Sequence, residues 1–226
     1  MIAKDEFWHV MEAYGAQIRP AQIVFYGAAI LLIGWLFLRP RRIQTLFAKL
    51  YLSLAFAWNG IAFYFVLAGD MAGDSHGNVV FGSVFVLVAV LFAVDSFRCR
   101  MQFSLPAVGW RKVTTLVLTL LAFCYPLFGI AFGHGFRSLI LPGTFPCPTT
   151  ALGLLVLTMA LPRVDKTIYL LLLVCAIPFT PFAQIARYGV YEDMILLVVG
   201  VYSLGLLLRY WKRQNVGGRT LGSTST

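Results

Sequence analysis

The sequence predicts an all-α, polytopic membrane protein, a bundle of seven transmembrane helices with its N-terminus outside the cell and its C-terminus in the cytoplasm. Hydrophobic residues make up 60% of the 226 residues and charged residues only 12%, whereas about a quarter of the residues of a soluble domain are charged. Seven apolar segments follow one another with little chain between them, and a helix that spans the bilayer needs roughly 20 such residues. Lys and Arg gather in alternate connections, which indicates the orientation.

Residues 1–20 are predicted to form a separate amphipathic helix on the outer surface. Apolar side chains recur there at i, i+4, i+7 and i+11, namely Phe7, Met11, Tyr14 and Ile18. This spacing places them on one helical face, and Arg19-Pro20 ends the helix. A helix of this kind lies in the membrane interface, with Trp8 at the level of the lipid headgroups. Two roles follow from this: an anchor, or a lid over an outward-facing vestibule.

The seven apolar segments are expected to form one transmembrane domain over residues 21–210. Their ranges are 21–38, 47–68, 79–97, 113–133, 147–162, 167–185 and 194–208. The segment after them, 211–226, is polar and rich in Gly, Ser and Thr, a composition typical of disordered chain. We therefore expect a disordered cytoplasmic tail.

The basic residues indicate how the bundle is oriented. When the connections are assigned alternately to the two sides, fourteen of the 18 Lys and Arg residues fall on one side, and the other side receives Lys4, Arg19, Arg137 and Arg187. Cytoplasmic connections carry the excess of positive charge. The same residues account for the net charge of +9 and the sequence pI of 9.7, because they face the anionic inner leaflet. The lipid bilayer is thus the expected partner, and no nucleic acid is expected.

The stretch "PCPTT" at residues 146–150 supplies the first candidate for chemistry. If Cys147 is the N-cap of the fifth helix, Pro148 stands at N1, where its missing N–H is tolerated, and Thr149 and Thr150 follow it. The unpaired N–H groups and the helix dipole then favour the thiolate of Cys147, which would make it a nucleophile or a soft-metal ligand. The alternative is an ordinary helix start that uses cysteine as a small residue.

Further candidate ligands are thiols and imidazoles. The predicted topology places three histidines on the outer side, at the level of Cys147: His9, His76 and His134. Cys124 and Cys175 lie near mid-depth, where they either receive a solute passed on from Cys147 or simply pack between helices. Thiolate and imidazole ligands suit soft metal ions. The candidate metal ligands are therefore Cys147, His134, His76 and His9.

Two polar residues inside the predicted spans need partners. Asn59 lies near the centre of the second span, and because an unsatisfied amide is costly there, we expect it to face another helix. Asp95 lies near the cytoplasmic end of the third span, three residues before Arg98. An i,i+3 ion pair is the simpler interpretation; a proton or cation site is the functional one.

The sequence resembles a family of bacterial integral membrane proteins known only as a domain of unknown function. The resemblance is carried by "FW" at Phe7-Trp8, "PAQI" at 20–23, Trp58, "GHG" at 133–135 and above all "PCPTT" at 146–150. It extends over nearly the whole chain. It implies a multi-helix fold in the bacterial inner membrane and supplies no activity.

Three function classes follow for this chain. One is a transporter or channel for a small solute, for which a soft metal ion handled by Cys and His is the sharpest candidate. Its expected solute-binding residues are Cys147, His134, Thr149, Thr150, Cys124, Cys175, Asn59 and Asp95. Another class is a non-enzymatic sensor, scaffold or accessory protein, and the third is a membrane-embedded enzyme that uses Cys147. The sequence contains none of the common hydrolase, metalloprotease or nucleotide-binding motifs in a useful context, so a non-enzyme is favoured. The sequence leaves the oligomeric state open.

Overall fold

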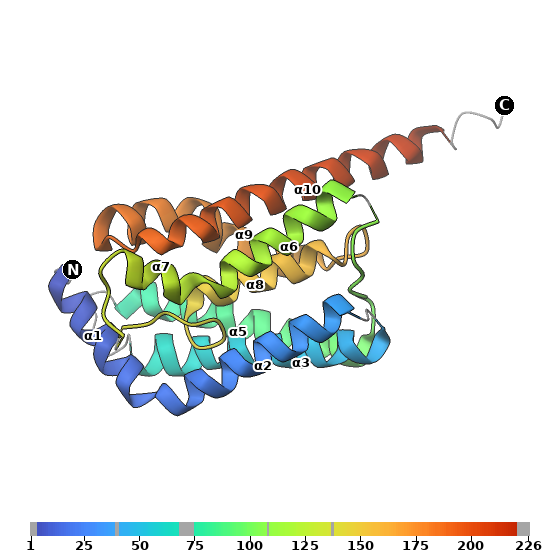
Figure 1. Ribbon diagram of the computed structural model, residues 1–226. Helices are drawn as coiled ribbons and strands as arrows, with labels where there is room; N and C mark the ends of the chain where they lie inside the picture. The colour runs from blue at the N-terminus through green and yellow to red at the C-terminus, as the bar shows by residue number, and fades with distance from the viewer. Residues whose placement is uncertain (1–3, 39–40, 68–74, 108, 137, 221–226) are drawn as a thin grey trace.

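The computed structural model describes residues 4–38, 41–67, 75–107, 109–136 and 138–220, with side chains except at residues 5, 67, 75–77, 180–183 and 212–220. The chain is a bundle of helices (Figure 1). The α-helices are α1 (Lys4–Gln17), α2 (Arg19–Leu38), α3 (Arg42–Trp58), α5 (Ser75–Arg98), α6 (Gly109–Phe123), α7 (Tyr125–Ala131), α8 (Pro146–Thr158), α9 (Lys166–Val174) and α10 (Met194–Thr220). The π-helices η1 (Asn59–Leu67) and η2 (Cys175–Tyr188) continue α3 and α9, and a single 3₁₀ turn, η3 (Tyr191–Asp193), precedes α10.

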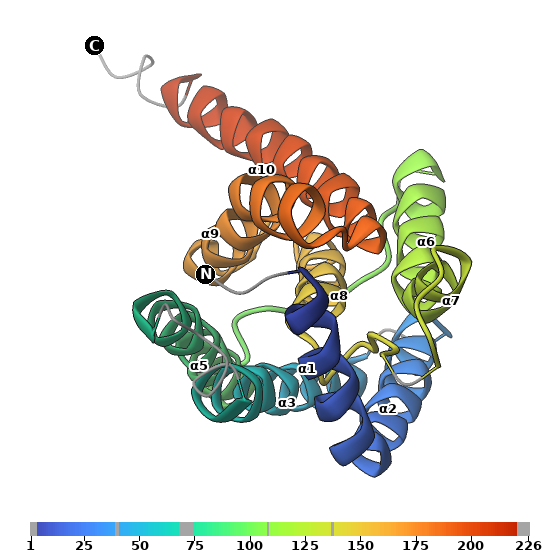
Figure 2. The same cartoon turned by 90° about the vertical axis from the view of Figure 1, so that its left-hand side faces the viewer.

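Helix α8 lies at the centre of the bundle. Viewed from the end that carries α1, it is surrounded by α2, α3, α5, α6, α9 and α10 (Figure 2). All of its residues except Cys147 are buried. Its sequence is compatible with this position, because a helix that is apolar on every side is surrounded either by protein or by lipid. Helix α8 thus serves as the core of the domain.

The number of candidate membrane spans is lower than the seven expected. Within the described residues, four helical stretches have the length and composition to cross a membrane: Arg19–Leu38, Arg42–Val66, Asn78–Arg98 and Tyr191–Trp211. A fifth is formed if α6 and α7 count as one span; they are bent by 57°, and Pro126 in the first turn of α7 accounts for the break. The other two apolar helices, Pro146–Thr158 and Lys166–Phe179, are shorter. Each predicted apolar segment does contain a helix, so the all-helical architecture is confirmed.

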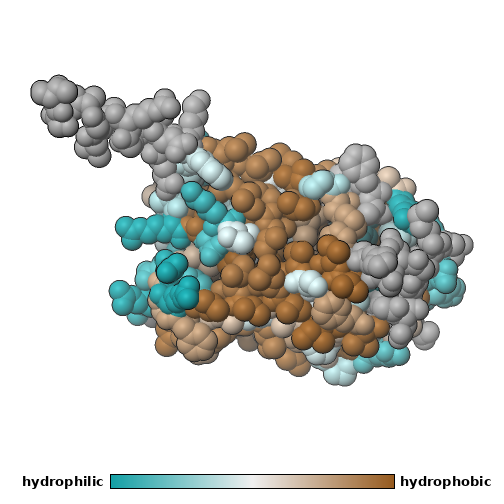
Figure 3. Space-filling view, turned by 180° about the vertical axis from the view of Figure 1, so that it is seen from behind, coloured by the Kyte–Doolittle hydropathy of each residue, from teal (hydrophilic) through white to brown (hydrophobic). Residues whose placement is uncertain are grey.

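The surface supports a membrane protein. Large apolar side chains are exposed along the lengths of the helices, among them Leu31 at 73% and Leu120 at 64%. From behind, hydrophobic side chains fill the middle of the molecule, while hydrophilic ones lie towards its ends (Figure 3). Soluble monomers rarely expose apolar patches of this extent. A lipid environment for this belt explains the exposure.

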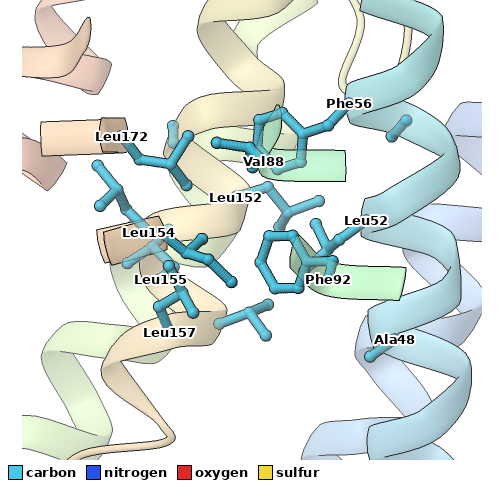
Figure 4. Packing of buried hydrophobic residues seen from close by; sticks show 14 of the residues in the cluster. Ala48, Leu52, Phe56, Val88, Phe92, Leu152, Leu154, Leu155, Leu157 and Leu172 are labelled. Carbon is cyan, nitrogen blue, oxygen red and sulfur yellow. The ribbon is translucent and has the colours of Figure 1, made fainter. Parts of the chain in front are cut away.

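The interior beneath the belt is apolar. Phe56 of α3 and Phe92 of α5 stack with ring centroids 5.9 Å apart, and leucines of α8 pack against them, including Leu152 and Leu155 (Figure 4). Leu172 of α9 closes the cluster on the opposite side. This layer lies between the two ends of the bundle and holds the helices together.

Asn59 faces neighbouring elements, as predicted. Its side-chain NH₂ donates to the carbonyl oxygen of Gly143 at 3.1 Å and lies 3.4 Å from the hydroxyl of Thr149 in α8. The same hydroxyl accepts from the backbone N–H of Gly143 at 2.8 Å. Gly143 has a φ of +99°, which favours glycine. These contacts fix the turn that leads into α8.

The bundle has two ends, the α1 end and the basic end. The α1 end carries α1 across the mouth of the bundle (Figure 2). The basic end is the opposite one, where α3 and α6 begin and α5 and α8 end (Figure 1). Helix α10 also leaves from the basic end and continues to Thr220, past residue 210, where the sequence predicts the start of a disordered tail.

Candidate functional site

Two adjacent acidic residues lie inside the protein at the α1 end. Glu192 and Asp193 belong to η3, and their exposed fractions are 2% and 0%. Gly189, with a φ of +71°, ends η2 and turns the chain towards them. Because charged carboxylates are almost never fully buried unless they are paired, the partners of these two residues define the site.

Asp193 lies next to one phenol and one thiol. The hydroxyl of Tyr125 in α7 donates to its Oδ1 at 3.0 Å, and the side chain of Cys147 in α8 lies near the carboxyl group. Its Oδ2 is buried without a hydrogen-bond partner among the described residues. Asp193 therefore retains an oxygen that can accept a donor from a ligand.

Glu192 pairs with the imidazole of His134. Their Oε1 and Nδ1 atoms lie 3.0 Å apart, and both side chains are largely shielded from solvent. The indole of Trp8 covers the imidazole with ring centroids 3.8 Å apart. The Oε2 of Glu192, like the Oδ2 of Asp193, is buried and unpaired within the described part of the chain.

Helix α1 covers this acidic pair. Its Trp8 indole donates to the carbonyl oxygen of Tyr188 at 3.2 Å, and Phe7 stacks on the ring of the same tyrosine. Further along, Tyr14 donates to the carbonyl oxygen of Thr144 and accepts from the indole of Trp58. Burial raises the pKa of Tyr14 to about 12, so it stays a neutral donor. Of the two predicted roles of this helix, these contacts favour the lid.

Cys147 does not occupy the predicted capping position. The N-cap of α8 is Phe145, so Pro146 stands at N1 and Cys147 falls within the first turn. Its thiol meets the carboxyl group of Asp193, and a neighbouring acid opposes rather than favours a thiolate. The expectation of an activated thiolate is therefore wrong, because the N-cap of α8 is Phe145 instead of Cys147 and the neighbouring carboxyl group of Asp193 opposes a thiolate.

The two threonines of the same motif have different surroundings. The hydroxyl of Thr149 donates to the carbonyl oxygen of Phe145 at 2.6 Å and accepts from Gly143, so it is fully used within the fold. The hydroxyl of Thr150 is buried and unpaired among the described residues. Thr150 stands three residues after Cys147, which places it on the same helical face one turn deeper.

The other predicted thiols are not gathered in one place. Cys175 lies within electrostatic reach of Cys147. Cys124 stands at the break between α6 and α7, where its neighbour is Tyr26 of α2. Cys147 and Cys175 thus lie in the same region of the bundle, and Cys124 lies on another flank.

Asp95 has a different partner from the predicted Arg98. Its Oδ2 lies 2.6 Å from the Nζ of Lys49 in α3, and both side chains are buried. Its carboxylate also accepts the backbone N–H groups of Arg100 and Met101. Asp95 points inwards to α3, whereas Arg98 at the end of α5 is exposed. Asp95 therefore joins α5 to α3 at the basic end and takes no part in the acidic site.

The predicted metal ligands that the structure describes, His9, His134 and Cys147, do not form a cluster. His9 is exposed on α1, and the side chain of His76 lies outside the described residues. Within the described part of the chain, no group of three or more His, Cys, Asp or Glu side chains is placed to hold a metal ion. His134 and Cys147 instead contact different members of the acidic pair.

Sequence reasoning missed the acidic pair itself. The signal is present, because "YED" at residues 191–193 stands directly before the last apolar segment, and acids at the edge of a span are candidates for function. Tyr125 gives no comparable signal, since tyrosines are common at membrane interfaces. Only the fold brings α7, α8 and η3 together.

Comparisons with known proteins identify a family and no activity. Residues 4–217 match the family model described as "Family of unknown function (DUF6064)". Searches of the curated proteins and of the solved structures found no match.

Proposed function

We propose a function from the site alone, because the chain belongs to the DUF6064 family, whose function is unknown: it is a membrane transporter that receives a small organic cation, of the alkylammonium class, at Glu192 and Asp193. The observation that carries the proposal is the pair of buried carboxyl oxygens that have no hydrogen-bond partner among the described residues, Glu192 Oε2 and Asp193 Oδ2. A buried acceptor without a donor lowers stability by about 1–3 kcal/mol. An ammonium group offers several N–H donors and a compensating charge.

The surroundings of the pair suit an organic cation. Trp8, Phe7 and Tyr188 contact one another above the acids, and Tyr125 contacts Asp193 directly. Aromatic faces attract ammonium groups. A soft metal ion is supported less well, because oxygen ligands suit harder cations and His134 and Cys147 are both engaged with carboxyl groups.

Access to the pair requires movement of α1. Glu192 and Asp193 are buried, and Trp8 lies on the imidazole that pairs with Glu192. This part of α1 is held by the Trp8–Tyr188 hydrogen bond, by the stacking of Phe7 on Tyr188 and by the contact of Trp8 with that imidazole. All three are contacts between side chains of α1 and a small part of the α1 end, so we propose that α1 lifts as a lid and admits the solute.

We also propose that the α1 end faces outwards and the basic end faces the cytoplasm of a bacterial inner membrane. The support is the partition of Lys and Arg, with fourteen of 18 assigned to the basic end. The solute then reaches the acidic pair from the outer side.

The test is uptake of radiolabelled methylammonium by proteoliposomes. Wild-type protein is expected to accumulate methylammonium faster than protein-free liposomes at neutral to slightly alkaline pH, where an alkylammonium group is charged. The double variant Glu192→Gln/Asp193→Asn is expected to reduce the protein-dependent rate about tenfold or more, since each lost charged hydrogen bond is worth roughly 1.5–3 kcal/mol.

The matched control for uptake is Glu6→Gln, which removes an exposed acid of α1 and leaves the pair intact. It should keep the wild-type rate. Equal rates for wild-type protein, the double variant and protein-free liposomes would contradict transport.

A second candidate, a non-enzymatic sensor or accessory protein, has one observation in its favour. The apolar layer around Phe56, Leu152 and Leu155 separates the acidic pair from the basic end. A solute bound at the pair therefore meets a packed interior. Methylammonium binding without uptake is the result that would favour this candidate.

A further inference from the structure

A cavity of about 190 Å³, lined by polar and apolar side chains, lies at the basic end, between the start of α3 and the end of α5. The side chains that matter here are Arg42, Thr45 and Lys49 from α3, with Ser96 and Gln102 from α5 and the segment after it. Arg42 and Gln102 are exposed, whereas Lys49 is buried. The cavity thus has a solvent-facing rim and a cationic side chain deep in its wall.

The charge of this cavity is positive. Asp95 pairs with Lys49 at 2.6 Å and already accepts two backbone N–H groups. Among the described residues Arg42 forms no ion pair, whereas Lys49 is paired with Asp95. One positive charge at the rim is therefore left without a counter-ion.

The backbone adds to this field. Helix α3 begins at Arg42, and no side chain caps its first turn. The first N–H groups of a helix lack intrahelical partners and carry partial positive charge that attracts anions. The start of α3 and the guanidinium of Arg42 therefore act on the same small volume.

The cavity also lies where the apolar belt ends. Phe97, beside Ser96, is 87% exposed, and Leu46 contributes an apolar patch to the cavity wall. In the sequence, the connections of this end hold fourteen Lys and Arg and two acids, Asp95 and Asp165. Basic pockets between helices on the cytoplasmic side of membrane proteins bind anionic lipid headgroups.

We propose that this cavity binds a phosphate-bearing anion, with Arg42 as the principal contact and Lys49 and the start of α3 as supporting positive charge. The phosphate belongs either to an anionic lipid headgroup or to a free phosphate. Thr45 and Gln102 supply polar groups around it. This site is separate from the acidic pair and does not depend on the transport proposal.

Two arms of one experiment distinguish the sources. In the first, native mass spectrometry counts the phosphatidylglycerol molecules that the purified protein retains from mixed micelles with phosphatidylcholine. In the second, thermal unfolding in phosphatidylcholine micelles is measured with inorganic phosphate and with chloride at equal ionic strength. Retention of phosphatidylglycerol identifies a lipid, and stabilisation by phosphate alone identifies the free anion.

Arg42→Gln is expected to weaken the binding of whichever probe binds the wild-type protein, phosphatidylglycerol or phosphate, about fivefold. This is the effect of one arginine near an anionic surface. Arg163→Gln removes an exposed arginine outside the cavity and serves as the matched control that should keep wild-type binding. Unchanged unfolding temperatures of both unliganded variants show that the fold is retained. The proposal is overturned if neither probe binds wild-type protein, or if the two variants weaken binding equally.

Discussion

Lys49→Met is expected to lower the free energy of unfolding by about 3–5 kcal/mol, the effect of removing one partner of a buried ion pair. Lys49 lies 2.6 Å from Asp95, and both are shielded from solvent. Without the ammonium group, the carboxylate keeps its two backbone donors and loses its counter-charge. Reversible unfolding of the purified protein in micelles measures the change.

A double-mutant cycle separates the ion pair from the loss of packing. Adding Asp95→Asn to Lys49→Met should recover part of the lost stability, because the uncompensated charge disappears. Arg98→Gln, at the predicted i,i+3 position, should stay within about 0.5 kcal/mol of wild type. A larger effect for Arg98→Gln than for Lys49→Met would contradict the structure of the basic end.

Asp193→Asn is expected to raise the dissociation constant for methylammonium about a hundredfold. The change replaces a charged acceptor by a neutral amide at the site of the unpaired Oδ2, and charged hydrogen bonds are worth roughly 1.5–3 kcal/mol in addition to the charge itself. Equilibrium binding to purified protein in micelles provides the measurement.

Tyr125→Phe is a milder change at the same site, and its effect on methylammonium binding is compared with that of Asp193→Asn. It removes the neutral donor that holds Oδ1 of Asp193 at 3.0 Å and keeps the carboxyl group. We expect a loss of about fivefold, the size of one ordinary hydrogen bond. Equal losses for Asp193→Asn and Tyr125→Phe would show that the charge of Asp193 does not contribute.

The helical architecture is predictable from the sequence because apolar periodicity and length determine it. The same criterion predicts a membrane span at α8, because "TTALGLLVLT" is apolar. In the structure this helix has only 13 residues and is buried by its neighbours. Mean hydropathy does not distinguish lipid from protein as the apolar surroundings of a helix. Only the arrangement of the neighbouring helices does.

The candidate site was less predictable because its residues are distant in sequence. His134 and Cys147 attract notice as residue types, whereas their partners Glu192 and Asp193 lie about 45 to 60 residues further along the chain. Likewise the partner of Asp95 is Lys49 on another helix, and local i,i+3 spacing cannot indicate a contact between helices. The sequence predicts Cys147 at the N-cap of α8. In the structure the helix starts at Pro146, so Cys147 lies within its first turn, next to the acidic pair.

The central claim is that a cation bound at Glu192 and Asp193 competes with the docking of α1. Hydrogen–deuterium exchange of the α1 amides, residues 4–17, with and without methylammonium tests it most directly. A ligand shifts a conformational equilibrium only if it prefers one state, and the pair is inaccessible while Trp8 covers His134. We predict faster exchange of α1 with methylammonium in the wild-type protein and no change in Asp193→Asn. Unchanged exchange in the wild-type protein, or an equal increase in both proteins, would contradict the account.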